Sequence, residues 1–219
     1  MPTPITSLSS DKPVCIVTGG SFGIGDAVCE KFSAQGYTVI NLDIQANPTQ
    51  SKAIDWLKCD MSVFSQVNQS IQHAIKQYGR IDCLVSNAGI HCSTNIEVTS
   101  EEDYAHVFDL NVKGAIAETK AVLPQMRAQK SGLIINVTSI AGYMGLPYRG
   151  IYSATKGALE LVTEAMRMEV KMFGIEIANV APGDFATNIA AGRYHTPVFL
   201  TSPYKEVYGA MLDEMDSHV

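Results

Sequence analysis

Two kinds of hydrophobic pattern alternate along the chain. Short continuous apolar runs, such as Val14–Val17, are too short for a helix and are typical of strands buried on both faces. Between them, apolar residues recur at helical spacing, as at Ile24, Val28 and Phe32. Strands are predicted at residues 14–17, 37–42, 53–58, 81–85, 132–137 and 175–180, and helices at residues 24–35, 62–78, 100–128, 152–173 and 202–218.

This alternation predicts the fold class. Apolar strands joined by crossover helices indicate an α/β fold, a doubly wound parallel sheet with helices on both faces. No repeat or linker interrupts the pattern, so residues 1–12 are interpreted as a polar leader and residues 13–219 as one domain. The last predicted helix is not followed by the strand that usually completes such a sheet, which leaves truncation at the C-terminus open.

Composition and charge narrow the range of partners. The 219 residues are 46% hydrophobic and 17% charged, which is enough for one substantial core. The formal net charge is -6 and the pI is near 5.3, and Lys and Arg are scattered. These values argue against nucleic acid and favour a small-molecule partner.

The cysteines and the N-terminus indicate where the protein resides. Five cysteines, without a CxxC pair, predict free thiols in a reducing environment. No signal-peptide pattern and no apolar run of about 18 residues is present, so we expect a cytoplasmic protein without a membrane segment. The histidines lack metal-ligand spacing, and no catalytic metal is predicted.

A glycine-rich turn, TGGSFGIG at residues 18–25, directly follows the first predicted strand and opens the first helix. In this context such a turn holds a pyrophosphate. Gly19 permits a positive φ, Gly23 leaves room for a phosphate, and Gly25 allows close packing of the helix. An ordinary glycine-rich loop is the alternative. The other candidate contacts in this turn are Ser21, Phe22 and Ile24.

Asp43 ends the second predicted strand, 18 residues after Gly25. An acidic residue near this spacing accepts both adenosine ribose hydroxyls and would repel a 2'-phosphate, so NAD is predicted rather than NADP. The first nearby cation is Lys52. A simple strand-end turn residue is the alternative for Asp43.

Asp60 and Met61 follow the third predicted strand. Asp60 is placed to accept a hydrogen bond from the adenine amino group, and the Met61 amide to donate one to the ring. Helix capping by Asp60 or Ser62 is an open alternative.

Tyr152 and Lys156 are four residues apart, which places them on one face of the helix predicted to begin there. A neighbouring cation stabilises phenolate, so Lys156 is predicted to lower the pKa of Tyr152 and make it a usable general acid/base. A chance pair on a solvent-facing helix is the alternative.

Together these motifs resemble those of the classical short-chain dehydrogenase/reductase family. The resemblance rests on TGGSFGIG, on SNAG at residues 86–89 and on YSATK at residues 152–156, and it extends over about residues 13–190. It implies a Rossmann-like fold and a catalytic tetrad in which Tyr152 is the acid/base and Lys156 also holds the nicotinamide ribose. Within that tetrad Ser139 orients the substrate oxygen and Asn111 anchors a water relay.

The resemblance also implies further cofactor contacts. Three positions are placed along the adenosine ribose: Asn87, Ala88 and Gly89. Four positions after the sixth predicted strand are assigned near the nicotinamide: Pro182, Gly183, Thr187 and Ile189. Ser86 replaces a common Asn, and we expect little consequence. Helices 100–128 and 152–173 often form subunit contacts in the family, so a homodimer or homotetramer is expected.

The predicted function is NAD(H)-dependent oxidation and reduction between a secondary alcohol and a ketone. The alternative from another class is a catalytically inactive NAD-binding regulator or scaffold. A sugar-nucleotide epimerase or dehydratase is a third reading, but it usually has a different glycine spacing. The expected pocket segments, residues 91–96, 141–149 and 185–203, mix apolar and charged residues and leave the substrate undetermined.

Overall fold

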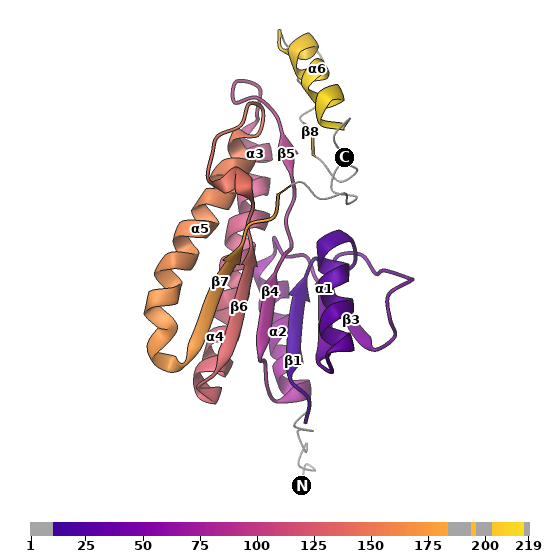
Figure 1. The fold of residues 1–219 in the computed structure, drawn as a ribbon, viewed down its shortest axis with the longest axis vertical. Helices are drawn as coiled ribbons and strands as arrows, with labels where there is room; N and C mark the ends of the chain where they lie inside the picture. Colours follow the sequence, from indigo (N-terminus) through magenta and orange to yellow (C-terminus); the bar gives the residue numbers. More distant parts are fainter. Residues whose placement is uncertain (1–10, 184–193, 196–202, 217–219) are drawn as a thin grey trace.

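The alternating pattern folds into one six-stranded parallel sheet (Figure 1). The computed structural model describes residues 11–183, 194–195 and 203–216. The strands are β1 (Val14–Thr18), β2 (Thr38–Asp43), β3 (Ile54–Lys58), β4 (Cys83–Ser86), β6 (Gly132–Val137) and β7 (Ile175–Val180). All six predicted strands are therefore present, with ends shifted by at most two residues.

The strand order β3-β2-β1-β4-β6-β7 reverses direction between β1 and β4. Ile16 of the central strand β1 is paired with Ile40 of β2 on one side and with Leu84 of β4 on the other. In a sheet of this kind the connections after the two strands diverge to opposite sides, which opens a crevice at their carboxyl ends.

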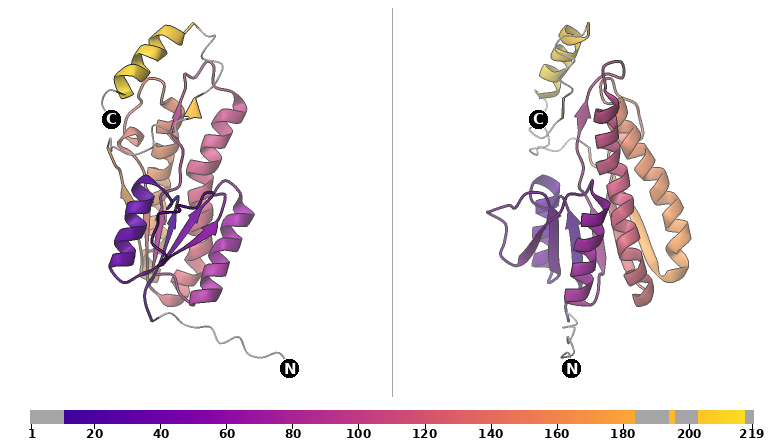
Figure 2. Two further views of the ribbon diagram at one scale, coloured as in Figure 1. Left: turned by 90° about the vertical axis from the view of Figure 1, so that its right-hand side faces the viewer. Right: turned by 180° about the vertical axis from the view of Figure 1, so that it is seen from behind.

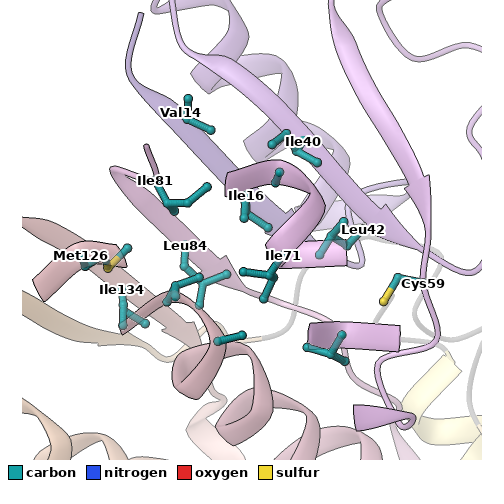
Figure 3. Close-up of a cluster of buried hydrophobic side chains, with 14 of the residues drawn as sticks. Val14, Ile16, Ile40, Leu42, Cys59, Ile71, Ile81, Leu84, Met126 and Ile134 are labelled. Carbon is teal, nitrogen blue, oxygen red and sulfur yellow. The ribbon is translucent and has the colours of Figure 1, made fainter. Parts of the chain in front are cut away.

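Helices cover both faces of the sheet, as predicted (Figure 2). They include α1 (Gly23–Ala34), α2 (Phe64–Tyr78), α4 (Ala115–Gln129) and α5 (Gly150–Val170). Successive residues of β1 point to opposite faces: Ile16 joins a cluster with residues of α2 and α4, and Val17 joins a second cluster with residues of α1. Figure 3 shows the first cluster, in which Ile71 of α2 and Met126 of α4 lie against the strands.

The helix predicted over residues 100–128 differs from expectation. It consists of α3 (Glu101–Phe108), a π-helical turn (Asp109–Gly114) and α4. The turn brings Gly114 so close to the chain that an added Cβ would lie 2.8 Å from the carbonyl oxygen of Met61. A π turn inserts one residue, which rotates the later positions around the helix axis, so one continuous helix does not describe this segment.

The predicted helix 152–173 begins earlier, at Gly150, and ends in a 3-10 turn (Lys171–Phe173). A second 3-10 turn covers Ile140–Gly142. A short parallel pair, β5 (Cys92–Ser93) with β8 (Tyr194–His195), was not predicted.

The last helix, α6 (Lys205–Asp216), lies within the predicted range 202–218. It is attached to the rest of the chain by Tyr208, whose hydroxyl donates to the carbonyl oxygen of Ser93 at 2.9 Å and whose ring lies 5.1 Å from that of Tyr148. None of the helices in the described ranges is long and apolar enough to cross a membrane.

Candidate active site

A cleft of about 510 Å³ lies at the carboxyl ends of the strands, next to the reversal of strand order. Its walls come from the turn after β1, from the ends of β2 and β3, and from the loop after β4. Ten residues predicted to contact the cofactor line it: Gly19, Phe22, Gly23, Ile24, Asp43, Asp60, Met61, Asn87, Ala88 and Gly89. The structure thus brings together residues that are up to 70 positions apart.

The glycine-rich turn is shaped by positions that exclude a side chain. Gly19 has a φ of 62°, the left-handed conformation expected for the tight turn, and Gly23 has a φ of 58°. A Cβ added at Gly25 would overlap the carbonyl oxygen of Gly19. The close packing at Gly25 is therefore against the turn itself, and α1 begins immediately at the cleft.

Ser21 differs from its predicted place, because its side chain is fully buried behind the cleft. Its hydroxyl donates to the carbonyl oxygen of Gln45 at 2.5 Å and accepts from the amide of Asn41 at 3.0 Å. These bonds join the glycine turn to β2 and to the connection after it. Phe22, the next residue, is exposed and lines the cleft instead.

Asp43 and Asp60 both face the cleft, and each carboxylate also organises the backbone. Asp43 accepts from the backbone amides of Ser21 at 3.1 Å and Gln45 at 3.0 Å. Asp60 accepts from the amide and hydroxyl of Ser62 at 2.9 and 2.6 Å. The capping alternative for Asp60 is thus partly realised, as a turn that precedes α2.

The loop after β4 is tied to the end of β1. The side-chain amide of Asn87 donates to the carbonyl oxygens of Thr18 and Gly19 at 3.1 and 3.0 Å. The Thr18 hydroxyl accepts from the backbone amides of Asn87 and Ala88, both at 3.1 Å. Asn87 therefore joins neighbouring strands while its loop lines the cleft.

Asn111 lies in the π-helical turn and is almost fully buried. Its side chain accepts from the backbone amide of Ile90 at 2.9 Å, and donates to the Ile90 carbonyl oxygen at 3.0 Å and to the Thr155 hydroxyl at 3.1 Å. Asn111 thus connects the loop after β4 to α5. A π turn at such a residue fits the frequent occurrence of these turns at functional sites.

Three members of the predicted tetrad meet near the cleft. The Lys156 ammonium donates to the carbonyl oxygen of Val137 at 2.9 Å and lies 5.8 Å from the centroid of the Tyr152 ring. Ser139, two residues after β6, lies close enough to Tyr152 to favour its phenolate. A Cβ added at Gly89, in the cleft lining, would lie 3.6 Å from the Lys156 ammonium, so this group is close to one end of the cleft.

The electrostatics differ from the prediction that Lys156 lowers the pKa of Tyr152. Burial raises the pKa of the Tyr152 phenol, whereas the hydrogen bond with Ser139 and the charge of Arg149 act in the opposite direction. Burial also lowers the pKa of Lys156 to about 8, against the effect of Glu118. In this arrangement desolvation exceeds the attraction between phenolate and cation.

Two contacts near the site were not predicted from the sequence. The ring of His91, in the expected pocket segment 91–96, lies 4.6 Å from that of Tyr152 and lines the cleft. Ser86 interacts with Glu118, a fully buried carboxyl group on α4. That the replacement of a common Asn by Ser86 has little consequence stays a prediction.

The segment after β7 is only partly described. Pro182 accepts a hydrogen bond from the amide of Ile140 at 3.2 Å, and Gly183 lies beside the same residue. Neither lines the cleft. The predicted contacts Thr187 and Ile189 lie outside the described residues.

Comparisons with known proteins show the family of the chain. The sequence model of a family described as short chain dehydrogenase matches residues 13–197. The chain is 36% identical over 180 residues to the 3-ketodihydrosphingosine reductase of Bacteroides thetaiotaomicron, which covers 82% of this chain and 66% of that protein.

Two solved structures are similar over most of the chain. ElxO with NADP bound has a TM-score of 0.77 and 31% identity, over 83% of this chain and 79% of that one. A short-chain dehydrogenase/reductase from Burkholderia phymatum, in complex with NAD, has a TM-score of 0.76 and 26% identity, over 84% and 70%. The two neighbours therefore bind different nicotinamide cofactors.

Proposed function

The chain belongs to the short-chain dehydrogenase family of oxidoreductases, and from that premise we propose that it interconverts a secondary alcohol and a ketone with NAD. The observation that carries the proposal is the meeting of Tyr152, Ser139 and Lys156 at one end of the cleft. The matched part of the first relative is 66% of its length, so the activity of the whole protein is part of the proposal.

The cleft fits a dinucleotide. A turn without side chains at Gly19 and Gly23 stands at the start of α1, where backbone amides and the helix dipole favour a phosphate. Asp43 ends β2 at the same cleft and would accept the ribose hydroxyls. No Lys or Arg is found in the cleft lining among the described residues, which supports NAD over NADP.

The side chains divide the remaining tasks. The bound nicotinamide would supply the hydride chemistry. The Tyr152 hydroxyl exchanges a proton with the substrate oxygen, and the Ser139 hydroxyl donates a hydrogen bond to that oxygen. Lys156 holds positive charge beside the phenol, and Asn111 keeps the loop after β4 in register with α5.

Assembly and location complete the proposal. The exposed apolar side chains Leu161, Met168 and Met172 on or next to α5 support a homodimer or homotetramer that uses this helix. The five cysteines are free and buried, which supports a reducing compartment and hence a cytoplasmic location.

The test is the variant Tyr152→Phe. We expect turnover on a panel of secondary alcohols and ketones to fall by about 10² to 10⁴-fold, because the exchangeable proton is lost. NADH affinity, measured by fluorescence, should stay within about twofold. Tyr37→Phe is the control, because Tyr37 precedes β2 at the end of the sheet opposite the cleft, where its ring packs against Phe32.

Unchanged turnover in Tyr152→Phe would contradict the assignment of Tyr152. Cofactor binding by the wild-type protein without turnover of any member of the panel would instead favour the regulator or scaffold.

A further inference from the structure

Behind the glycine-rich turn lies a network of side-chain amides. The chain between β2 and β3, residues 44–53, takes part in it and is called here the β2–β3 connection. Gln50 of this connection donates from Nε2 to the carbonyl oxygen of Gly20 at 2.7 Å and to Oδ1 of Asp26 at 2.8 Å. Asp26 is on α1, so the connection is fastened both to the turn and to the helix that follows it.

Asn41 of β2 is the centre of this network and is fully buried. Its Oδ1 accepts from the backbone amide of Gly20 at 3.0 Å. Its Nδ2 donates to the Ser21 hydroxyl and to Oε1 of Gln50, both at 3.0 Å. All polar atoms of this amide are therefore satisfied, as burial requires. Because β2 is paired with both β1 and β3, the network is anchored on a rigid element.

Two further hydrogen bonds hold the β2–β3 connection near its ends. Close to its start, the Ser21 hydroxyl donates to the carbonyl oxygen of Gln45 at 2.5 Å. Close to its other end, the backbone amide of Ser51 donates to Oε1 of Glu30 on α1 at 2.9 Å. The side-chain hydrogen bonds of Ser21, Glu30, Asn41 and Gln50 are together called here the clamp, because they hold the connection against the turn and α1.

The clamp also determines which donors are available beside Asp43. The carboxylate of Asp43 accepts from the backbone amides of Ser21 and Gln45 at 3.1 and 3.0 Å. The hydroxyl hydrogen of Ser21 is used by the carbonyl oxygen of Gln45. An anion placed here would thus meet a carboxylate and three donors that are already bonded, which is unfavourable. A ribose hydroxyl is itself a donor and can use the remaining lone pairs of the carboxylate.

From this arrangement we infer that Gln50 is a positioning residue for cofactor specificity, which through the clamp withholds the donors that a 2'-phosphate would need. The inference rests on the proposed use of NAD and deepens it. Two separate obstacles then oppose NADP. The charge of Asp43 repels the phosphate, and the clamp keeps the β2–β3 connection from opening around it.

Two obstacles of this kind make a pair of substitutions non-additive. In Gln50→Ala the connection is released from Gly20 and Asp26, but Asp43 still repels the phosphate. In Asp43→Asn the repulsion is removed, but the clamp still holds the connection. Only in the double variant can the backbone amides of Ser21 and Gln45 turn to the phosphate.

The experiment measures the affinities of NADH and NADPH by fluorescence titration of the full chain in the wild type, the two single variants and the double variant. The ratio of NADPH affinity to NADH affinity should rise by less than about twofold in Gln50→Ala and by about tenfold in Asp43→Asn. In the double variant it should rise by about 200-fold, which is about tenfold more than the product of the single effects. A ratio equal to that product would overturn the inference.

A matched variant separates this role from general support of the cleft. Gln66 on α2 accepts through Oε1 from the backbone amide of Asp60 at 3.0 Å, so it holds the chain after β3 beside the same cleft. Gln66→Ala combined with Asp43→Asn should leave the ratio at the value for Asp43→Asn alone. An equal gain with this variant, or a loss of both affinities in Gln50→Ala without a gain in the double variant, would overturn the inference.

Ser21→Ala tests the clamp at a second position and decides the question if Gln50→Ala does not fold. It removes the hydrogen bond to the carbonyl oxygen of Gln45 and leaves Gln50 in place. Combined with Asp43→Asn, it should raise the ratio beyond the product of the single effects, by a smaller factor than Gln50→Ala. A ratio equal to the product would contradict the inference.

The titration requires no substrate, so its outcome is independent of turnover. A wild-type protein that bound NADPH more tightly than NADH would contradict both the proposed cofactor and the clamp. Tighter binding of NADH by the wild type, without a gain in either double variant, would overturn the inference and leave the proposed use of NAD intact.

Discussion

The two sides of the active site, called here its first and second walls, are built in different ways. On the side of β1 and α1, Gly19 and Gly25 shape the surface by the absence of side chains. On the side of α4 and α5, buried polar side chains such as Asn111 and Lys156 join separate elements through hydrogen bonds. The first wall is therefore sensitive to added atoms, and the second to lost charge or hydrogen bonds.

The largest effect on stability is expected in the second wall. Burial raises the pKa of Glu118 from 4.5 to about 8, so the folded protein keeps a proton that the unfolded chain releases between these values. Stability from this group is thus present below about pH 4.5 and decreases as the pH rises to about 8.

Glu118→Gln should remove this decrease. Relative to the wild type, its free energy of unfolding should rise between pH 5 and pH 8 by an amount on the order of 3 kcal/mol. Urea denaturation at several pH values measures the difference between the two proteins. If the difference in the free energy of unfolding between the two proteins did not vary with pH, the pKa of Glu118 would not be raised in the folded protein.

An intermediate effect is expected in the first wall. Gly25→Ala places a methyl group against the carbonyl oxygen of Gly19, which is backbone and cannot move aside cheaply. We expect a loss of about 1–3 kcal/mol in stability and a weaker NADH affinity, because the turn must widen. Thermal unfolding and NADH fluorescence measure the two quantities.

Gly145→Ala is the matched control for this variant. An added Cβ there meets no atom within 4 Å, and Gly145 has no positive φ. Its stability should change by no more than about 0.5 kcal/mol. Equal losses of stability in Gly25→Ala and Gly145→Ala would show that the close contact with the carbonyl oxygen of Gly19 is not what destabilises the first variant.

The same contrast explains what the sequence could predict. The strands and the glycine turn follow from short local patterns, and Tyr152 and Lys156 are one helical turn apart. The pairing of Ser86 with Glu118 joins positions 32 residues apart, and no local pattern connects them. The π turn at Asn111 was not predicted, because residues 100–128 were interpreted as one continuous helix.

The direction in which the pKa of Tyr152 is shifted could not be predicted from the sequence either. Spacing identifies the neighbouring cation, but not the burial of both groups, which decides the sign of the shift. Similarly, Ser21 belongs to the glycine motif, yet its side chain faces Asn41 rather than the cleft. Local patterns therefore predicted which residues gather at the site better than how each is oriented.

The smallest effect is expected for cofactor preference at Asp43. Asp43→Asn removes the charge that would repel a 2'-phosphate, while one oxygen remains to accept from Ser21 or Gln45. Because the carboxylate is partly exposed and screened, the ratio of kcat/KM for NADP to that for NAD should rise by only about tenfold, or about 1.4 kcal/mol. Asp60→Asn also removes a charge from the cleft lining but should affect both cofactors equally. A similar change of ratio in both variants would show that the net charge of the cleft, rather than the position of Asp43, sets the preference.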